Sequence, residues 1–203
     1  SWSSGYLIFQ IYTPLMFHFH GPVPAGQVGI TISMWTAIFS MSNIWIYAAT
    51  PRMNMLVAKK QWHALDRTFL KNLILSAATY AAGIAALSLF VVLVSGKVTF
   101  IDNVITRFLP LVPVIFIGTG WFLQIFVNGM AVYMRSHKQE PMLYLSLASA
   151  AFILSATLAA AKYLPSDYFF MGFTASYAWG LPATLLLFLH KRKLWHAKQR
   201  DGT

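Results

Sequence analysis

The chain opens with SWSSGYLIFQIYTPLMFHFHGPVPAGQVGITISMWTAIFSMSNIWIYAATP (Ser1–Pro51), a stretch that contains no Asp, Glu, Lys or Arg. A charged side chain near the centre of a bilayer costs about 2.5–3.5 kcal/mol on insertion scales. An α-helix needs roughly 20 predominantly apolar residues to cross the hydrocarbon core. This stretch is therefore apolar enough to enter a membrane, and it is too long for a single crossing.

Four further charge-free stretches of membrane-spanning length follow. They are Asn72–Gly96, Phe108–Met134, Pro141–Ala161 and Tyr168–His190. Of the 203 residues, 58% are hydrophobic and only 10% are charged, whereas soluble domains carry about 25% charged residues. These features predict an all-α fold, and specifically a polytopic membrane helix bundle.

Glycine and proline divide the first stretch in two, because they are concentrated in HGPVPAG (residues 20–26). We predict a transmembrane bundle over residues 1–190 and a basic cytoplasmic tail over residues 191–203. The six spans are expected at about residues 4–19, 25–49, 69–94, 109–133, 142–164 and 169–189. The basic segment 51–65 is expected either as a helix at the headgroup boundary or as an ordinary loop.

The Lys and Arg residues are distributed unequally between the two sides that this topology defines. Twelve of the 15 lie on the side of the N-terminus, in segments 51–71 and 135–140 and in the tail. Lys97, Arg107 and Lys162 lie on the other side. The positive-inside rule therefore places both termini in the cytoplasm. Because this bias and the contact with anionic lipid headgroups explain the net charge of +10, nucleic-acid binding is not expected.

Uncharged polar and aromatic side chains inside the spans are the candidates for a substrate path. Gln124 and Asn128 lie four residues apart and share a helix face. Asn43 lies in the cytoplasmic half of the second span, and Tyr177 and Trp179 lie in the middle of the sixth. Polar groups in a membrane turn toward a neighbouring helix or a wet cavity. The alternative to a substrate path is a structural role, in which the amides join helices and the rings pack.

The residue inventory argues against catalysis and metal binding. The chain has no cysteine and five acidic residues, all outside the predicted spans. His18 and His20 lie two residues apart on a predicted helix and face different ways, so that they do not form a metal site by themselves. The sequence has no P-loop and no hydrolase or metalloprotease motif. We expect a protein that is not an enzyme, with no catalytic residue, metal or cofactor.

Three short sequences suggest a family. GPVPAGQVG (residues 21–29) joins the first two spans, and the second span ends in ATPRM (residues 49–53) before the basic LVAKK (residues 56–60). Together with the short loop YLPSD (residues 163–167) and the basic tail, this arrangement resembles the C-terminal half of the polysaccharide and O-antigen flippases. These belong to the multidrug/oligosaccharidyl-lipid/polysaccharide exporter superfamily. The resemblance covers nearly the whole chain and one of the two six-helix lobes of that family.

The resemblance implies one lobe of a V-shaped, two-lobe transporter in a bacterial inner membrane. Such a transporter moves lipid-linked oligosaccharide or polysaccharide precursors across the bilayer by alternating access. The partners implied are the lipid bilayer, the lipid-linked oligosaccharide, and a missing N-terminal lobe or a second copy. The cavity of the family is basic, whereas the spans here lack Lys and Arg. Charges for a pyrophosphate would therefore come from the missing lobe or from Arg52 at the cytoplasmic mouth.

Other hypotheses remain open. A small-solute or drug exporter of the same superfamily should need an intramembrane carboxylate for ion coupling, which the spans lack. A non-transporting membrane scaffold should have polar side chains that pair with each other and leave no cavity. The residue inventory disfavours an intramembrane enzyme. Because no signal peptide precedes the first apolar stretch, Ser1 is expected to lie inside a longer protein.

Overall fold

The computed structural model of the chain describes residues 2–94, 107–138 and 140–197, and the side chains of residues 10–93, 107–138 and 140–196. Within these residues the chain forms helices and no β-strand, which confirms the all-α class. The helices are α1 (Trp2–His20), α2 (Pro22–Ala58), α3 (Trp62–Val94), α5 (Leu111–Ser136), α6 (Leu143–Tyr163), the 3-10 helix η1 (Ser166–Tyr168) and α7 (Met171–Ala197).

Four of these helices, α3, α5, α6 and α7, are long enough and apolar enough to cross a membrane. The prediction of six spans is thus confirmed for four helices by length and composition, and it is not confirmed for α1 and α2. The second helix is 37 residues long, but its Ser, Thr, Asn and Trp residues lower its mean hydropathy. In α1 the described side chains begin at Gln10, which leaves fewer residues than a crossing needs.

The junction between α2 and α3 is much shorter than the sequence indicated. The second helix continues through Pro51 to Ala58, and only Lys59–Gln61 separates it from α3. An ordinary loop over residues 51–65 is therefore a wrong prediction, whereas the headgroup position of this segment stays a prediction. Three apolar side chains of this segment, those of Met53, Leu56 and Leu65, are buried in the core of the bundle, whereas Met55 is exposed.

The predicted tail also begins as helix. The last helix extends past the predicted end of the sixth span at residue 189 to Ala197. The first residues of the 191–203 segment therefore belong to α7, and residues 198–203 lie outside the described part of the chain. Near the start of the chain, the break between helices was predicted over residues 20–26, but in the structure only Gly21 separates α1 from α2. Its φ of 89° lies in a region that glycine occupies without steric cost.

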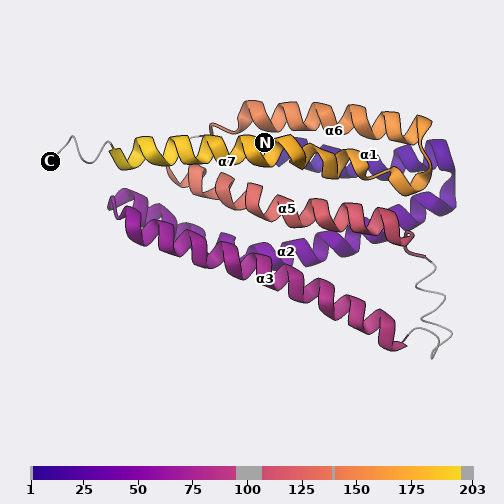
Figure 1. Cartoon of the computed structure of the whole chain (residues 1–203), viewed down its shortest axis with the longest axis horizontal. Coiled ribbons are helices and arrows are strands. Elements are labelled where there is room, and N and C mark those ends of the chain that lie inside the picture. The colour runs from indigo at the N-terminus through magenta and orange to yellow at the C-terminus, as the bar shows by residue number, and fades with distance from the viewer. Residues whose placement is uncertain (1, 95–106, 139, 198–203) are drawn as a thin grey trace.

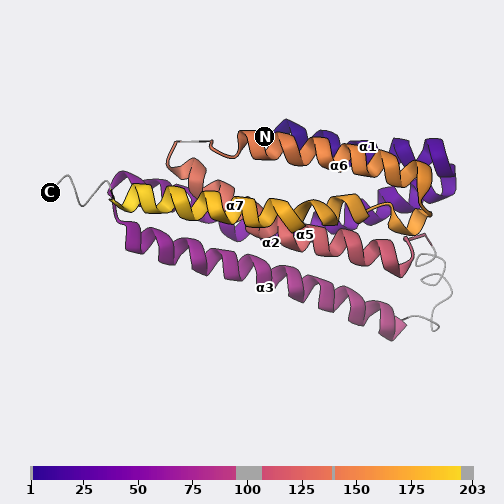
Figure 2. The ribbon, with the colours of Figure 1, turned by 45° about the horizontal axis from the view of Figure 1, so that its top comes forward.

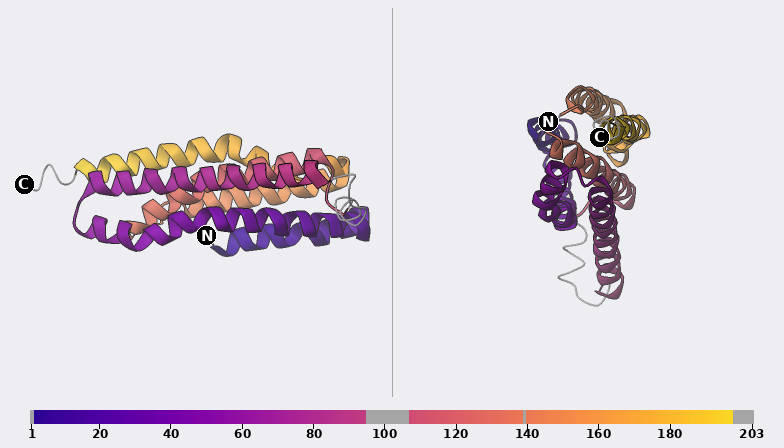
Figure 3. Two further views of the ribbon diagram at one scale, coloured as in Figure 1. Left: turned by 90° about the horizontal axis from the view of Figure 1, so that it is seen from below. Right: turned by 90° about the vertical axis from the view of Figure 1, so that its left-hand side faces the viewer.

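Five helices form a closed ring (Figures 1 and 3). Around this ring, α1 packs on α2, α2 on α5, α5 on α7, α7 on α6, and α6 on α1. The last of these contacts includes a hydrogen bond of 3.3 Å from the Thr157 hydroxyl on α6 to the Tyr12 hydroxyl on α1. The third helix lies outside the ring, packs along α2 and against α5, and diverges from the bundle toward its C-terminal end (Figure 2).

Successive helices run in opposite directions (Figure 1). As a result, the α2–α3 turn, the α5–α6 turn and the C-terminal end of α7 lie at the same end of the bundle. We call this end, formed by residues 52–71, 135–138 and 191–196, the basic end, because these segments carry most of the Lys and Arg residues. The arrangement is the one that the predicted topology requires.

Candidate functional site

A cavity of about 1280 Å³ opens at the basic end between α2, the α2–α3 turn, the N-terminal part of α3 and the C-terminal part of α7. Its lining contains one carboxylate, Asp66, and two histidines, His63 and His196. The Lys and Arg side chains that line it are Arg52, Lys60, Arg67, Lys71 and Arg192. This basic cavity therefore combines a concave shape with an excess of positive charge.

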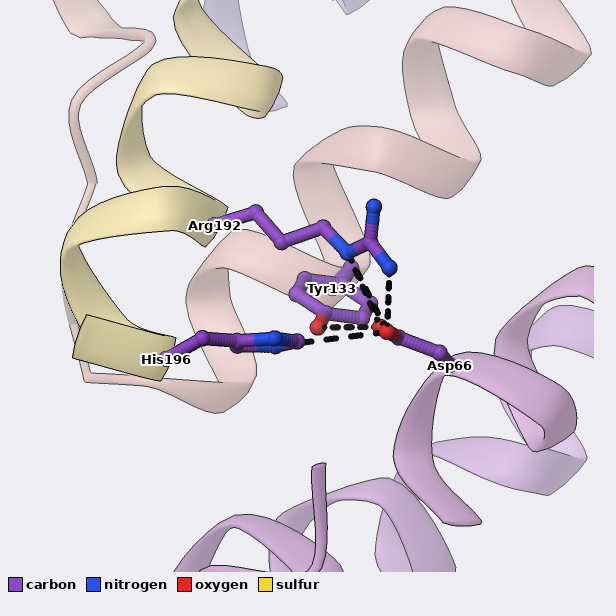
Figure 4. Close-up of polar contacts among 4 residues, drawn as sticks. All are labelled: Asp66, Tyr133, Arg192 and His196. Atoms are coloured by element: carbon purple, nitrogen blue, oxygen red, sulfur yellow. Dashed lines mark hydrogen bonds and ion pairs between the residues drawn. The ribbon is translucent and has the colours of Figure 1, made fainter. Parts of the chain in front are cut away.

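The Asp66 carboxylate is held by side chains from two other helices (Figure 4). Arg192 on α7 donates hydrogen bonds from Nε over 3.1 Å and from Nη2 over 2.5 Å to Oδ2 of Asp66. The Tyr133 hydroxyl on α5 donates to Oδ1 over 2.8 Å. A guanidinium and a carboxylate paired in this way have a fixed relative orientation. Asp66 thus neutralises Arg192, and the other four Lys and Arg side chains of the lining form no ion pair within the described residues.

A column of four stacked rings adjoins this ion pair. His196 Nε2 lies 4.0 Å from Asp66 Oδ2, and the His196 ring stacks on Trp62. The column continues through His137 to Trp195, with successive centroid distances of 5.5, 5.6 and 3.7 Å and interplanar angles of 19°, 16° and 7°. Burial lowers the pKa of His137, because its charged form would lose hydration. The ion pair and the column together fasten α3, α5 and α7 at the basic end.

The structure brings four of the predicted substrate-path residues together as two pairs. Asn128 Nδ2 on α5 donates to Asn43 Oδ1 on α2 over 2.7 Å and to the Tyr47 hydroxyl over 3.2 Å. The Tyr177 hydroxyl on α7 donates to Gln124 Oε1 on α5. Each pair joins neighbouring helices of the ring. These contacts match the structural role that the sequence left open as an alternative.

The other two predicted residues lie apart from these pairs. Trp179 packs edge-on against Phe152 of α6, with ring centroids 5.9 Å apart. Arg52 lines the basic cavity together with Trp45. Residues two positions apart on a helix point about 200° away from each other, so that Trp45 and Tyr47 lie on opposite faces of α2. The cavity and the Asn43–Asn128 pair are therefore on different sides of that helix.

A second cavity, of about 710 Å³, lies toward the opposite end between α2, α3 and α5. Apolar side chains dominate its lining, among them Trp35, Ile84, Phe90, Leu109 and Val114. Its position corresponds to the region in which α3 diverges from the bundle. The two amide-containing pairs line neither this cavity nor the basic cavity.

Sequence reasoning missed the contacts that fasten the basic end, namely those of Asp66, Tyr133 and Arg192 and the ring column. One signal was present, because Asp66 is the only acidic residue in the basic segment 51–71. A single carboxylate among many cations predicts an ion pair. The partner could not be derived, because Arg192 follows 126 positions later in the sequence.

No family model, curated protein or solved structure matches this chain. The class is therefore defined by the fold and the site alone. The described chain is an all-helical bundle with four helices of membrane-spanning length and composition, and a basic cavity opens at one end.

Proposed function

We propose that this chain is one six-span lobe of a transporter that flips lipid-linked oligosaccharide or polysaccharide precursors across a bacterial inner membrane. The observation that carries the proposal is the helix alternation, which gathers three basic segments at one end of a bundle whose predicted spans contain no charge. Under the positive-inside rule this end faces the cytoplasm, with both termini.

The ring supports two further crossings, by α1 and α2. The second helix carries no charge before Arg52, and it packs along α5, which has the length and composition of a membrane span. A helix packed along a spanning helix lies at the same depth in the bilayer. The first helix packs between α2 and α6, which supports a crossing by α1 as well.

The polar groups between the ring helices suit a carbohydrate cargo. A sugar chain presents many hydroxyls, and neutral amides can bond to them without the cost of burying a charge. The Tyr47 side chain is 53% exposed, so the hydrogen-bonded group of Asn43, Asn128 and Tyr47 reaches the surface of the lobe. We assign Gln124 and Asn128 to hydrogen bonding of sugar hydroxyls and the ring of Trp179 to stacking on sugar faces. Asn43 and Tyr177 are buried, and we assign them to positioning these two amides.

The experiment is to replace Gln124 and Asn128 with Leu in the full-length two-lobe transporter and to measure surface polysaccharide at matched expression. We expect export to fall strongly. The control is Thr174→Val, which removes a hydrogen bond from Thr174 on α7 to the Phe116 carbonyl on α5 without touching the proposed route. Unchanged export in the Gln124→Leu/Asn128→Leu variant would remove both residues from the route.

A non-transporting scaffold is the second candidate function. It is favoured by one observation, namely that the amides of Asn43, Gln124 and Asn128 bond to other polar side chains of the protein. The Gln124→Leu/Asn128→Leu variant also separates the two functions. If the chain is a scaffold, this variant should be less stable, and polysaccharide export should be unchanged. A small-solute or drug exporter is less well supported, since the predicted spans contain no carboxylate for ion coupling.

A further inference from the structure

We infer that the basic cavity binds the phosphate headgroup of an anionic phospholipid from the cytoplasmic leaflet. The inference rests on the membrane placement proposed above and is independent of the transported cargo. The expected ligand is a structural lipid that joins α2, α3 and α7 at the basic end, and cardiolipin, with two phosphodiesters, is the probe of choice.

The charge balance of the cavity calls for an anion. Its only carboxylate in the described lining, Asp66, is already bonded to Arg192. Four cations therefore face one concave site without a counterion among the described residues. Arg67 and Lys71 lie one turn apart on α3, and Arg52 and Lys60 come from the end of α2 and the turn that follows it. Cations held together in a concave site repel each other and raise the local concentration of anions.

The lining changes from apolar to basic along α2, and this change favours an amphiphile over a soluble anion. On α2 the lining runs from Trp45, Ala48 and Ala49, which lie inside the predicted second span, to Arg52 just beyond it. A lipid places acyl chains against the first group and its phosphate against the second. Basic pockets between transmembrane helices on the cytoplasmic side bind such headgroups. The indoles of Trp45 and Trp62 in the lining suit the same interfacial depth.

The cavity is separate from the proposed sugar route. It lies on the α3 side of α2, whereas Tyr47 and the Asn43–Asn128 pair lie on the other side. A lipid seated in the cavity therefore leaves this sugar route free, and it assigns Arg52 to the lipid, so that the charges for the pyrophosphate of the cargo would come from the missing lobe. It would instead cross-link the outer helix α3 to the ring.

The test measures lipid retention by native mass spectrometry, and the unfolding temperature, of the full chain in an uncharged detergent with added cardiolipin or phosphatidylcholine. We expect cardiolipin to be retained and to raise the unfolding temperature, and phosphatidylcholine to do neither. The variant Arg67→Gln/Lys71→Gln should bind cardiolipin about tenfold more weakly or worse, because each basic residue near a phosphate contributes separately to binding.

A matched control removes two positive charges from exposed positions of the same end that do not line the cavity, in the variant Lys59→Gln/Lys193→Gln. Its affinity should stay within about twofold of the unchanged protein, because neither side chain lines the cavity. Equal weakening in both variants would overturn the inference. The variant Arg52→Gln/Lys60→Gln changes the opposite wall, so a folding defect in the α3 variant does not remove the test.

Two further outcomes would also overturn the inference. One is equal retention of cardiolipin and phosphatidylcholine. The other is displacement of cardiolipin by an equal concentration of inorganic pyrophosphate, which would define a site for soluble phosphate. Polysaccharide export separates this inference from the proposed function. Cardiolipin binding with no dependence of export on Gln124 and Asn128 would contradict the proposed sugar route alone.

Discussion

The carboxylate of Asp66 on α3 accepts hydrogen bonds from both Nε and Nη2 of Arg192 on α7, across 126 positions of sequence. The third helix packs mainly along α2 and α5, so this ion pair gives it a direct side-chain contact with a further helix of the ring. The same carboxylate also receives the Tyr133 hydroxyl of α5. Three helices are therefore joined through one side chain.

The first prediction concerns this ion pair. Because the side chains of Arg192 and Asp66 are 40% and 25% exposed, solvent weakens their attraction only in part. Asp66→Ala and Arg192→Ala should each lower the free energy of unfolding by about 1–2 kcal/mol. Unfolding of both variants and of the double variant in detergent would give their coupling energy, which we expect near 1 kcal/mol. Additive effects would show that the pair contributes nothing of its own.

The second prediction concerns pH. A histidine in an unfolded chain titrates near pH 6.5, whereas burial lowers the pKa of His137 in the folded protein. Below about pH 6.5 the unfolded chain therefore binds the proton more readily, and stability falls as the pH decreases. Above about pH 7.5 this contribution should be fully present.

The variant His137→Phe tests the origin of that pH dependence. Phenylalanine keeps a ring against Trp195 and removes the titrating group, so that the unfolding temperature should fall less steeply between pH 7.5 and 5.5 by about the share of one histidine. The nearby groups His196 and Asp66 also act on His137, the first lowering its pKa and the second raising it. An unchanged pH slope in the variant would assign the effect to other groups.

The third prediction concerns the close approach of α6 and α7. A Cβ added at Gly172 would lie 2.6 Å from the Ala156 Cβ, and 3.3 and 3.4 Å from the backbone atoms Ala156 C and Thr157 N. Because backbone cannot move aside as a flexible side chain can, Gly172→Ala should destabilise the bundle by about 1–3 kcal/mol. At Gly26 nothing lies within 4 Å. Gly26→Ala should therefore stabilise α2 by up to about 1 kcal/mol, and thermal unfolding would show the opposite signs.

The fourth prediction concerns the amide pair between α2 and α5. Asn128→Leu leaves the Asn43 Oδ1 acceptor without its donor, and interhelical hydrogen bonds in membranes contribute about 0.6 kcal/mol on average and about 1.7 at most. The variant should lose stability within that range. Tyr47→Phe removes the longer hydrogen bond of 3.2 Å between Asn128 and an exposed residue, and should change stability by less. Equal losses of stability in the two variants would show that the bond to Tyr47, and not the bond to Asn43, carries the stabilisation.

The fifth prediction concerns the crossing of α2. Because the chain has no cysteine, single cysteines report their location without background. Val23 and Asn54 are both exposed and lie near opposite ends of α2. In spheroplasts, a membrane-impermeant maleimide should label Val23→Cys, as it should the exposed control Tyr163→Cys on the same predicted side, and should leave Asn54→Cys unlabelled. Labelling of both α2 positions would contradict the crossing.

Charge-free length was enough to predict the helices, since the structure places a helix over each predicted span. It was not enough to predict where α2 and α3 meet, because α2 continues past the charged Arg52 to Ala58 while Met53 and Leu56 still face the core. A count of charges cannot distinguish that arrangement from a loop.

The candidate site, too, was predicted only in part from the sequence. The i, i+4 spacing predicted a shared face for Gln124 and Asn128, but it could not predict that one bonds to α7 and the other to α2. Those partners depend on the order of the helices around the ring. Arg52 was identified as a candidate from its charge at the end of a span, and its position in a multi-helix cavity depended on contacts with α3 and α7.

The contact between Tyr12 and Thr157 bridges 145 positions of sequence, and this has a consequence for biosynthesis. A ribosome completes α1 and α2 well before α6 has been translated, and nascent chains generally fold from the N-terminus onward. The hydrogen bond between Tyr12 and Thr157 therefore forms only near the end of synthesis. Closure of the ring is a late event, and a translation product that stops before α6 has its helices in an open arc.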